Sequence, residues 1–452
     1  MADPYTQPGG AVLAPPDTWR ARLGYLGPSV IVSGSIVGSG EIILTASLGA
    51  AAGYVLLWWM LFACWSKSIV QAELGRYTVL SGDTYLRALN RLPGKIAGPR
   101  GAVSWPILLG LLNFLPGITG LGGIVGGAGL AVSLLFPGID PLISTGAVAC
   151  VTAFILGTGG YRRLETVMLG LVMSFTFITL VCALLMQGTE YATNLDDLAA
   201  GFSFSFPTEF AVVALAAYGY TGVNSGEISA YTYWCIEKGY PGRVGERDDS
   251  PEWLERARGW LAVLRTDVWV TLIILTFATV PFYLLGAGVL NAVGEVPSGN
   301  DTIIALSGMF TETLGPWAKV LFATGAFCIL FSTTLAGIAA GGRFIPDYLI
   351  EMGFTRRDDL NLRRSIIKVY VSVIPFLAFA LYAFFQRPVL MVLVAGCFAA
   401  IMLPIQSGAT LWLQRRYLPE ELQPSVAARS LLILTFFVQL ILSFAVVYYV
   451  VL

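Results

Sequence analysis

Long apolar stretches, separated by short clusters of charged, proline and glycine residues, run through almost the whole chain. A helix that crosses a bilayer needs about 20 mostly apolar residues, and eleven stretches meet this requirement. They lie near 28–50, 53–76, 103–135, 140–158, 163–187, 209–236, 260–289, 303–345, 366–385, 388–413 and 428–451. Because the apolar runs are continuous rather than alternating, a transmembrane β-barrel is excluded. The pattern predicts an all-α polytopic membrane protein with about eleven transmembrane helices.

Basic residues are concentrated in alternate loops, among them Arg87 after the second span and Arg343 and Arg363 after the eighth. The positive-inside rule places such loops in the cytoplasm. We therefore expect a cytoplasmic N-terminus and an extracellular C-terminus, in a prokaryotic plasma membrane. Residues 1–17 are rich in proline and glycine and lack the basic start and apolar core of a signal peptide. They are predicted to form a disordered tail before a single transmembrane domain at 18–452.

The composition supports a membrane protein and argues against several other classes. Apolar residues make up 56% of the chain and charged residues 12%, and the formal net charge is -1, which gives no reason to expect a nucleic-acid partner. Histidine is absent, which removes the commonest general base and the commonest transition-metal ligand. The six cysteines show no CxxC spacing, so neither a disulfide framework nor a zinc site is expected. We predict a protein that is not an enzyme and has no cofactor.

Two acidic residues lie in the middle of apolar spans, each beside a cluster of glycines. Residues 39–42 and 225–228 both read SGEI and contain Glu41 and Glu227. A tetrapeptide match can arise by chance, so the positions of the two copies are the informative observation. Ionisable residues inside a membrane are costly and usually functional, and glycine clusters weaken a helix and expose its carbonyl groups.

Interrupted helices at corresponding positions of two halves indicate the site of an inverted-repeat transporter. We therefore predict a first repeat at 28–187, a second repeat at 209–413 and an extra helix at 428–451. The alternative is that the glycines only permit close helix packing and that the glutamates bond to neighbouring hydroxyl groups.

If both glutamates face one cavity, their charges repel unless a cation or protons lie between them. Neither motif contains a thioether, thiol or imidazole, and hard oxygen ligands suit magnesium or manganese better than copper or zinc. The oxygen donors near the glutamates are Ser39, Thr221, Asn224, Ser225 and the carbonyls freed by the glycines.

Several segments resemble the Nramp family of divalent-metal transporters over nearly the whole chain. GPSVIVSGSIVGSGEI and GAAAGYVLLWWMLF are similar to its first span and the entry to its second, and QAELGRYTVLSGDTYLRAL to the loop that follows. YRRLETVM, FSTTLAGIAAGGRF and Leu403-Pro404 resemble parts of its fifth, eighth and tenth spans. The resemblance implies a LeuT-type fold with broken helices 1 and 6, and metal uptake by alternating access, usually coupled to protons.

The metal-binding motifs of that family are altered in this chain. Its first-span DPGN falls on Gly38 to Glu41, its sixth-span MPHN on Asn224 to Glu227, and its upstream carbonyl ligand on Thr221. The tenth-span glutamine falls on Gly396. The third span lacks the family's acidic residues and the ninth lacks their basic partners.

This chain lacks the family's methionine, histidine and charged relay. Within the family it therefore resembles the prokaryotic magnesium-transport-like branch. We predict a secondary transporter, acting as a monomer, that moves magnesium or manganese with weak or absent proton coupling. The predicted ligands are the side chains of Glu41, Glu227 and Asn224 and the carbonyls of Gly38 and Thr221.

A second resemblance leaves an alternative open. GSIVGSGEIILTAS is also similar to the segment with which amino-acid and polyamine permeases hold a substrate carboxylate. An amino-acid or cationic amine permease is therefore the alternative function, and two glutamates favour the amine. Lys67 is an unusual charge within the second span. We expect it to snorkel from the cytoplasmic end of its helix; otherwise it pairs with a buried carboxylate and stands in for a coupling cation.

Overall fold

The computed structural model describes Tyr5 and residues 12–28, 38–98, 100–159 and 161–451. The first part of the predicted first span, including Gly34, lies outside these residues. Within them, nine helical segments are long and apolar enough to cross a membrane. This confirms the prediction of an all-helical polytopic membrane protein, whose sixth span is divided into two shorter helices.

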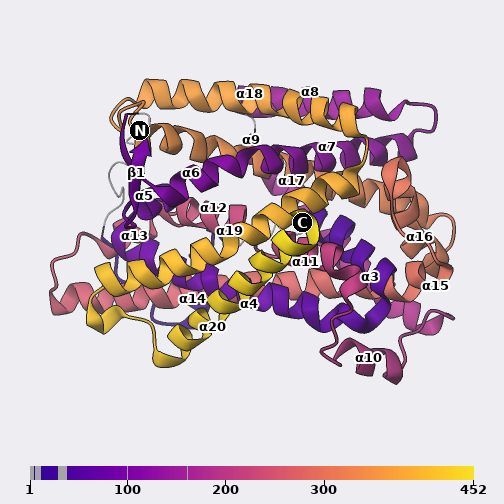
Figure 1. Cartoon of the computed structure of the whole chain (residues 1–452), viewed down its shortest axis with the longest axis horizontal. Coiled ribbons are helices and arrows are strands. Elements are labelled where there is room, and N and C mark those ends of the chain that lie inside the picture. The colour runs from indigo at the N-terminus through magenta and orange to yellow at the C-terminus, as the bar shows by residue number, and fades with distance from the viewer. Residues whose placement is uncertain (1–4, 6–11, 29–37, 99, 160, 452) are drawn as a thin grey trace.

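The longer helices coincide with the predicted spans (Figure 1). They are α4 (Leu57–Ser81), α7 (Phe114–Leu135), α8 (Pro141–Thr158), α9 (Tyr161–Leu185), α14 (Pro251–Leu285), α17 (Ala318–Glu351), α18 (Leu360–Phe385), α19 (Pro388–Tyr417) and α20 (Val426–Val446). Shorter helices include α1 (Trp19–Leu23), α3 (Ala46–Ala52), α5 (Tyr85–Asn90), α6 (Trp105–Leu112), α10 (Leu195–Gly201), α13 (Tyr240–Val244), α15 (Asn291–Val293) and α16 (Thr302–Leu314). A small antiparallel hairpin of β1 (Lys95–Gly98) and β2 (Gly101–Ser104) joins α5 to α6.

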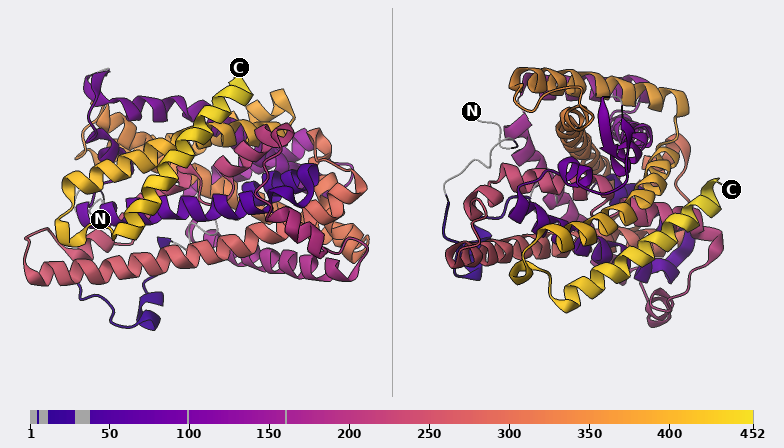
Figure 2. Two further views of the ribbon diagram at one scale, coloured as in Figure 1. Left: turned by 60° about the horizontal axis from the view of Figure 1, so that its bottom comes forward. Right: turned by 60° about the vertical axis from the view of Figure 1, so that its left-hand side comes forward.

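The helices form a thick bundle with the broken spans inside it. On one edge α18 lies beside α8, and on another α14 lies beside α4 (Figure 1). The 35-residue α14 extends along most of the molecule (Figure 2). Between these pairs lie α7, α17 and α19, and α20 packs against α19 and α4. The core therefore surrounds the segments that contain the two SGEI motifs.

The sixth span is interrupted between α11 (Ala211–Tyr220) and α12 (Ser225–Glu237). Thr221 and Asn224 have extended backbones, and Gly222 between them has a φ of +70°. A glycine adopts this left-handed conformation at little cost, whereas a side chain would strain it. The glycine cluster therefore creates a real break in the helix. The end of the first span is also irregular, since η1 (Gly40–Thr45) has the wider π-helical winding before α3 begins.

The first half of the broken span, α11, packs backbone to backbone against α19. A Cβ atom at Gly219 would lie 2.0 Å from the carbonyl oxygen of Gly396, and a Cβ atom at Gly396 would lie 2.4 Å from the carbonyl oxygen of Ala216. Gly396 therefore has a packing role here, at the position where the family resemblance implied a ligand.

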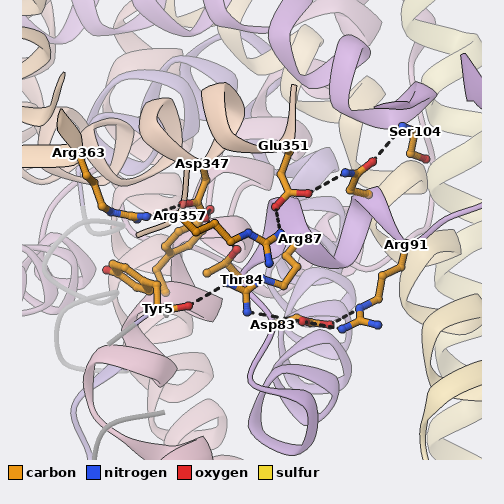
Figure 3. A network of polar contacts seen from close by, with 12 residues as sticks. Tyr5, Asp83, Thr84, Arg87, Arg91, Ser104, Asp347, Glu351, Arg357 and Arg363 are labelled. Atoms are coloured by element: carbon orange, nitrogen blue, oxygen red, sulfur yellow. Dashed lines mark hydrogen bonds and ion pairs between the residues drawn. The ribbon is translucent and has the colours of Figure 1, made fainter. Parts of the chain in front are cut away.

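The basic loops that the sequence places on one side of the membrane meet at one end of the bundle, which we call the basic face. Asp347 of α17 accepts hydrogen bonds from Thr84 (2.8 Å) and Tyr233 (2.8 Å), and it forms an ion pair with Arg363 (2.9 Å) (Figure 3). This carboxylate joins the segment before α5 to α12, α17 and α18. We call these four residues the Asp347 cluster.

The described parts of the predicted N-terminal tail also contact this face. The ring of Tyr5 lies 4.6 Å from the guanidinium of Arg363, and the carbonyl of Tyr5 accepts a hydrogen bond from Arg87 at 2.9 Å (Figure 3). Farther along, Leu13 bonds through its backbone to Arg243 and Trp260. These residues are packed against the domain, while positions 1–4 and 6–11 of the tail lie outside the described residues.

Candidate functional site

The two SGEI glutamates form equivalent backbone contacts in the first and sixth spans. Oε2 of Glu41 accepts the N–H of Gly38 at 3.1 Å, and Oε2 of Glu227 accepts the N–H of Asn224 at 3.0 Å. Asn224 completes a capping box, because its side-chain oxygen accepts the N–H of Glu227 at 3.1 Å. Carboxylates at these positions satisfy N–H groups without helical partners and interact favourably with the positive end of the helix dipole.

Glu41 also joins the two broken spans. Its Oε1 accepts the N–H of Gly222 at 3.0 Å and the hydroxyl of Thr279 at 3.4 Å, and the side chain is fully buried. The spans touch directly beside it, since the hydroxyls of Thr45 and Thr221 are 3.0 Å apart. Glu41 therefore holds the unwound segment of the sixth span against the first.

Lys67 lies at the opposite side of the same break. Its side chain is fully buried, and its ammonium donates hydrogen bonds to the carbonyls of Tyr218 and Thr221. It also lies 5.3 Å from the centre of the Tyr218 ring. The expectation that Lys67 snorkels was therefore wrong. The alternative, a pair with a buried carboxylate, is not what its hydrogen bonds show, since they go to two backbone carbonyls and Glu73 pairs with Arg76. The Thr221 carbonyl, predicted to bind metal, accepts a hydrogen bond from this lysine.

A cavity of about 240 Å³ begins at the break and extends between α7, α12, α17 and α19 toward the basic face. Glu227 and Asn224 line it, whereas Glu41, Gly38 and Thr221 are absent from its described lining. The five predicted ligands thus form two neighbouring groups. Two of them reach the cavity, and three lie in the packed contact between the broken spans.

Further polar residues, which the sequence analysis did not identify, line the cavity. The amide nitrogen of Gln406 in α19 donates to the Ser225 carbonyl at 2.7 Å and to the Ser229 hydroxyl at 2.9 Å. Burial raises the pKa of Tyr85 to about 12, so its hydroxyl stays protonated. Asn113 is a further amide on the lining. The sequence signal that could have identified Gln406 is that it is a polar residue inside an apolar span, just after Leu403-Pro404.

The polar groups of the cavity are oxygen and amide donors around one carboxylate, and the thioether of Met402 also lies on the lining. Among the described residues, no three or more histidine, cysteine, aspartate or glutamate side chains are close enough to hold a metal together. The lining offers a carboxylate, amides and hydroxyls, and its volume leaves room for water at about 30 Å³ per molecule. Such a site fits a cation that keeps part of its hydration shell.

Comparisons with known proteins place this geometry in context. The family model described as natural resistance-associated macrophage protein-like (Nramp) matches residues 29–449. An uncharacterized protein of Pasteurella multocida is 26% identical over 71% of this chain and 69% of its own length. The divalent metal cation transporter MntH of Mycobacterium tuberculosis is 24% identical over 72% of this chain and 70% of its own length.

Solved structures share the fold at low sequence identity. A mutant of the Eremococcus coleocola manganese transporter has a TM-score of 0.65 and 15% identity, covering 98% of this chain and 90% of that one. MhsT in complex with L-phenylalanine has a TM-score of 0.55 and 17% identity, covering 97% of this chain and 99% of that one. At these identities the likeness concerns the fold alone.

Proposed function

Because the chain belongs to the natural resistance-associated macrophage protein-like (Nramp) family, we propose that it is a transporter that moves a divalent metal cation across the membrane by alternating access. The observation that supports this most directly is the position of Glu227. Its carboxylate lies at a helix break, in a cavity lined by further oxygen donors and embedded in an apolar bundle. The names of related proteins, a divalent metal cation transporter and a manganese transporter, agree with such a substrate.

Magnesium and manganese are the preferred ions in this proposal. Both bind oxygen ligands, and magnesium in particular keeps several waters when it binds protein. The cavity supplies Glu227, the Asn224 amide and the amide of Gln406 without a thiol or imidazole on the described lining. A carboxylate accepts several contacts at once, so Glu227 can cap α12 and face a hydrated ion together.

We further propose that proton coupling is weak or absent and that the basic face is cytoplasmic. The third span, at 103–135, contains no acidic residue or histidine to relay a proton. The basic loops after the second, sixth and eighth spans lie together with the N-terminal segment, and the positive-inside rule assigns such a face to the cytoplasm.

A cationic amine is the alternative substrate, and two observations favour it over an amino acid. Lys67 offsets one of the charges of Glu41 and Glu227, which leaves these three residues with one net negative charge. Aromatic rings, which attract cations through their faces, also line the cavity: Tyr85, Phe114, Tyr220, Trp234, Phe344, Tyr348 and Tyr370.

The test is uptake of Mn²⁺, Mg²⁺ and Ca²⁺ into proteoliposomes, with and without a pH gradient. We expect flux of Mn²⁺ or Mg²⁺ without acidification of the lumen, and loss of this flux in Glu227→Gln. Glu209→Gln is the matched control, since Glu209 is exposed and lies before α11. Absence of flux for all three metals, together with uptake of an organic amine, would replace the proposal by the permease.

A further inference from the structure

We propose that Lys67 is a built-in cation that fills the place of a soluble coupling ion at the break of the sixth span, so that transport requires no sodium. This inference rests on the proposed transport function, and it concerns a residue outside the predicted substrate site. It follows from what the ammonium binds, from the charge it faces, and from its attachment to a different helix.

The ammonium occupies a position that is suited to a cation. The last carbonyls of a helix have no partner within it and form the negative end of its dipole. In transporters with broken helices, the ends of half-helices and the unwound carbonyls coordinate the coupling ion. Lys67 donates to the carbonyl of Tyr218 in the last turn of α11 and to that of Thr221 just beyond it.

An opposite charge holds the other end of the same peptide group. Glu41 accepts the N–H of Gly222, while Lys67 binds the carbonyl of Thr221, and these two groups belong to the one Thr221–Gly222 peptide. Both side chains are fully buried. Since a buried charge without compensation is strongly unfavourable, this lysine and glutamate balance each other across the break without an ion from solution.

The covalent attachment of the ammonium to a different helix is as important as its charge. Lys67 belongs to α4, whereas the carbonyls belong to α11 and the segment that follows it. The adjacent turn of α4 makes a parallel contact, because the hydroxyls of Ser66 and Tyr218 are 2.9 Å apart. The cation thus stays at its site throughout a cycle, whereas a soluble ion would bind and leave.

The first test measures thermal stability and is independent of the substrate. In purified Lys67→Ala, the truncated side chain leaves space for a small cation beside two carbonyls. We expect its melting temperature to fall below that of the wild type in choline chloride and to rise saturably with sodium or ethylammonium at constant ionic strength, because ligands of the folded state stabilise it by mass action. The wild type and the exposed-lysine control Lys319→Ala should show no such rise.

The second test measures Mn²⁺ uptake by the same proteins. Wild-type uptake should be unchanged when choline replaces sodium on both sides of the membrane. Lys67→Ala should lose roughly tenfold or more, as expected when a buried charge loses its partner, and regain uptake with sodium or ethylammonium. Lys67→Met fills the space without charge and should stay low in every salt.

The outcomes separate the inference from the proposed function. If the wild type needs sodium, or if neither cation restores stability or uptake to Lys67→Ala, the inference is wrong and Lys67 only holds α4 to α11. If Lys67→Ala cannot be purified in choline, its yield with sodium or ethylammonium becomes the readout, and no recovery overturns the proposal. If the cations stabilise Lys67→Ala but the wild type transports no metal, the role of Lys67 stands and the proposed substrate fails.

Discussion

Glu41 and Glu227 make the same hydrogen bond in the two halves of the molecule, since Oε2 of each accepts the N–H of the residue three positions before it. The relationship gives the shared tetrapeptide a structural meaning, because in each copy the glutamate side chain folds back onto the backbone before it. The two residues differ in their surroundings. Glu41 is fully buried between two broken spans, whereas Glu227 lies at the wall of the cavity. This difference allows their roles to be tested separately.

Glu41→Gln should destabilise the protein. The carboxylate accepts hydrogen bonds from two backbone N–H groups and one hydroxyl. In glutamine one of the two acceptor oxygens becomes an NH₂ group, which is itself a donor and cannot accept these bonds. The variant also removes one of the two carboxylate charges near Lys67. A buried polar group that loses its partner costs about 1–3 kcal/mol, so the melting temperature should fall measurably. A melting temperature equal to that of Glu209→Gln would contradict the bridging role of Glu41.

Glu227→Gln should instead keep its stability and lose transport. Glutamine also serves as the third residue of a capping box, so the bond to the Asn224 N–H can persist. Only the charge that faces the cavity is removed. We expect a melting temperature close to that of the wild type, no stabilisation by added MnCl₂, and loss of Mn²⁺ uptake. The wild type should be stabilised by the same metal. If the variant transports normally, Glu227 acts only as a helix cap.

Gly219→Ala should weaken the packing of α11 against α19. The new methyl group would meet the carbonyl oxygen of Gly396 at 2.0 Å, and backbone atoms cannot turn away as a flexible side chain can. Overpacking of this kind costs about 1–3 kcal/mol, which thermal denaturation would detect. Gly170→Ala is the control, because a methyl group at Gly170 in α9 would meet no neighbouring atom of the described chain within 4 Å. Equal melting temperatures for the two variants would show that α11 moves aside freely.

Asp347→Asn should open the cavity toward the basic face. The carboxylate joins Thr84, Tyr233 and Arg363, and the neutral amide loses the ion pair. The readout is the rate at which a membrane-impermeant thiol reagent labels a cysteine placed at Ala340 on the cavity lining. We expect several-fold faster labelling from the basic side, after the labelling of the native cysteines has been subtracted.

Asp249→Asn is the matched control for this variant, because Asp249 pairs with Arg247 on the exposed surface. It should leave the labelling rate unchanged. An unchanged rate in Asp347→Asn as well would show that the cluster does not close the cavity.

The bundle and the break in its sixth span could be predicted from the sequence because both depend on local composition. Continuous apolar runs set the spans, and the glycines at 219, 222 and 226 marked the interruption that the structure places between Tyr220 and Ser225. Such features require no knowledge of which helices meet.

The positions of single side chains could not be predicted in the same way. The helix of Lys67 has 25 residues, more than the roughly 20 needed to cross the bilayer core, so its depth was undetermined and a snorkelling position seemed natural. Only the contact between α4 and α11 places the ammonium inside the protein. Tyr5 is similar, because its local sequence is that of a disordered tail and its partners come from α5, α12 and α18.

The Asp347 cluster has a kinetic consequence for the transport cycle. One carboxylate binds donors from three separate segments, so withdrawing a single segment leaves the other two in place. On the proposed transport function, we expect the basic face to open only after all three of these contacts are lost. Such a step would give turnover a steep temperature dependence.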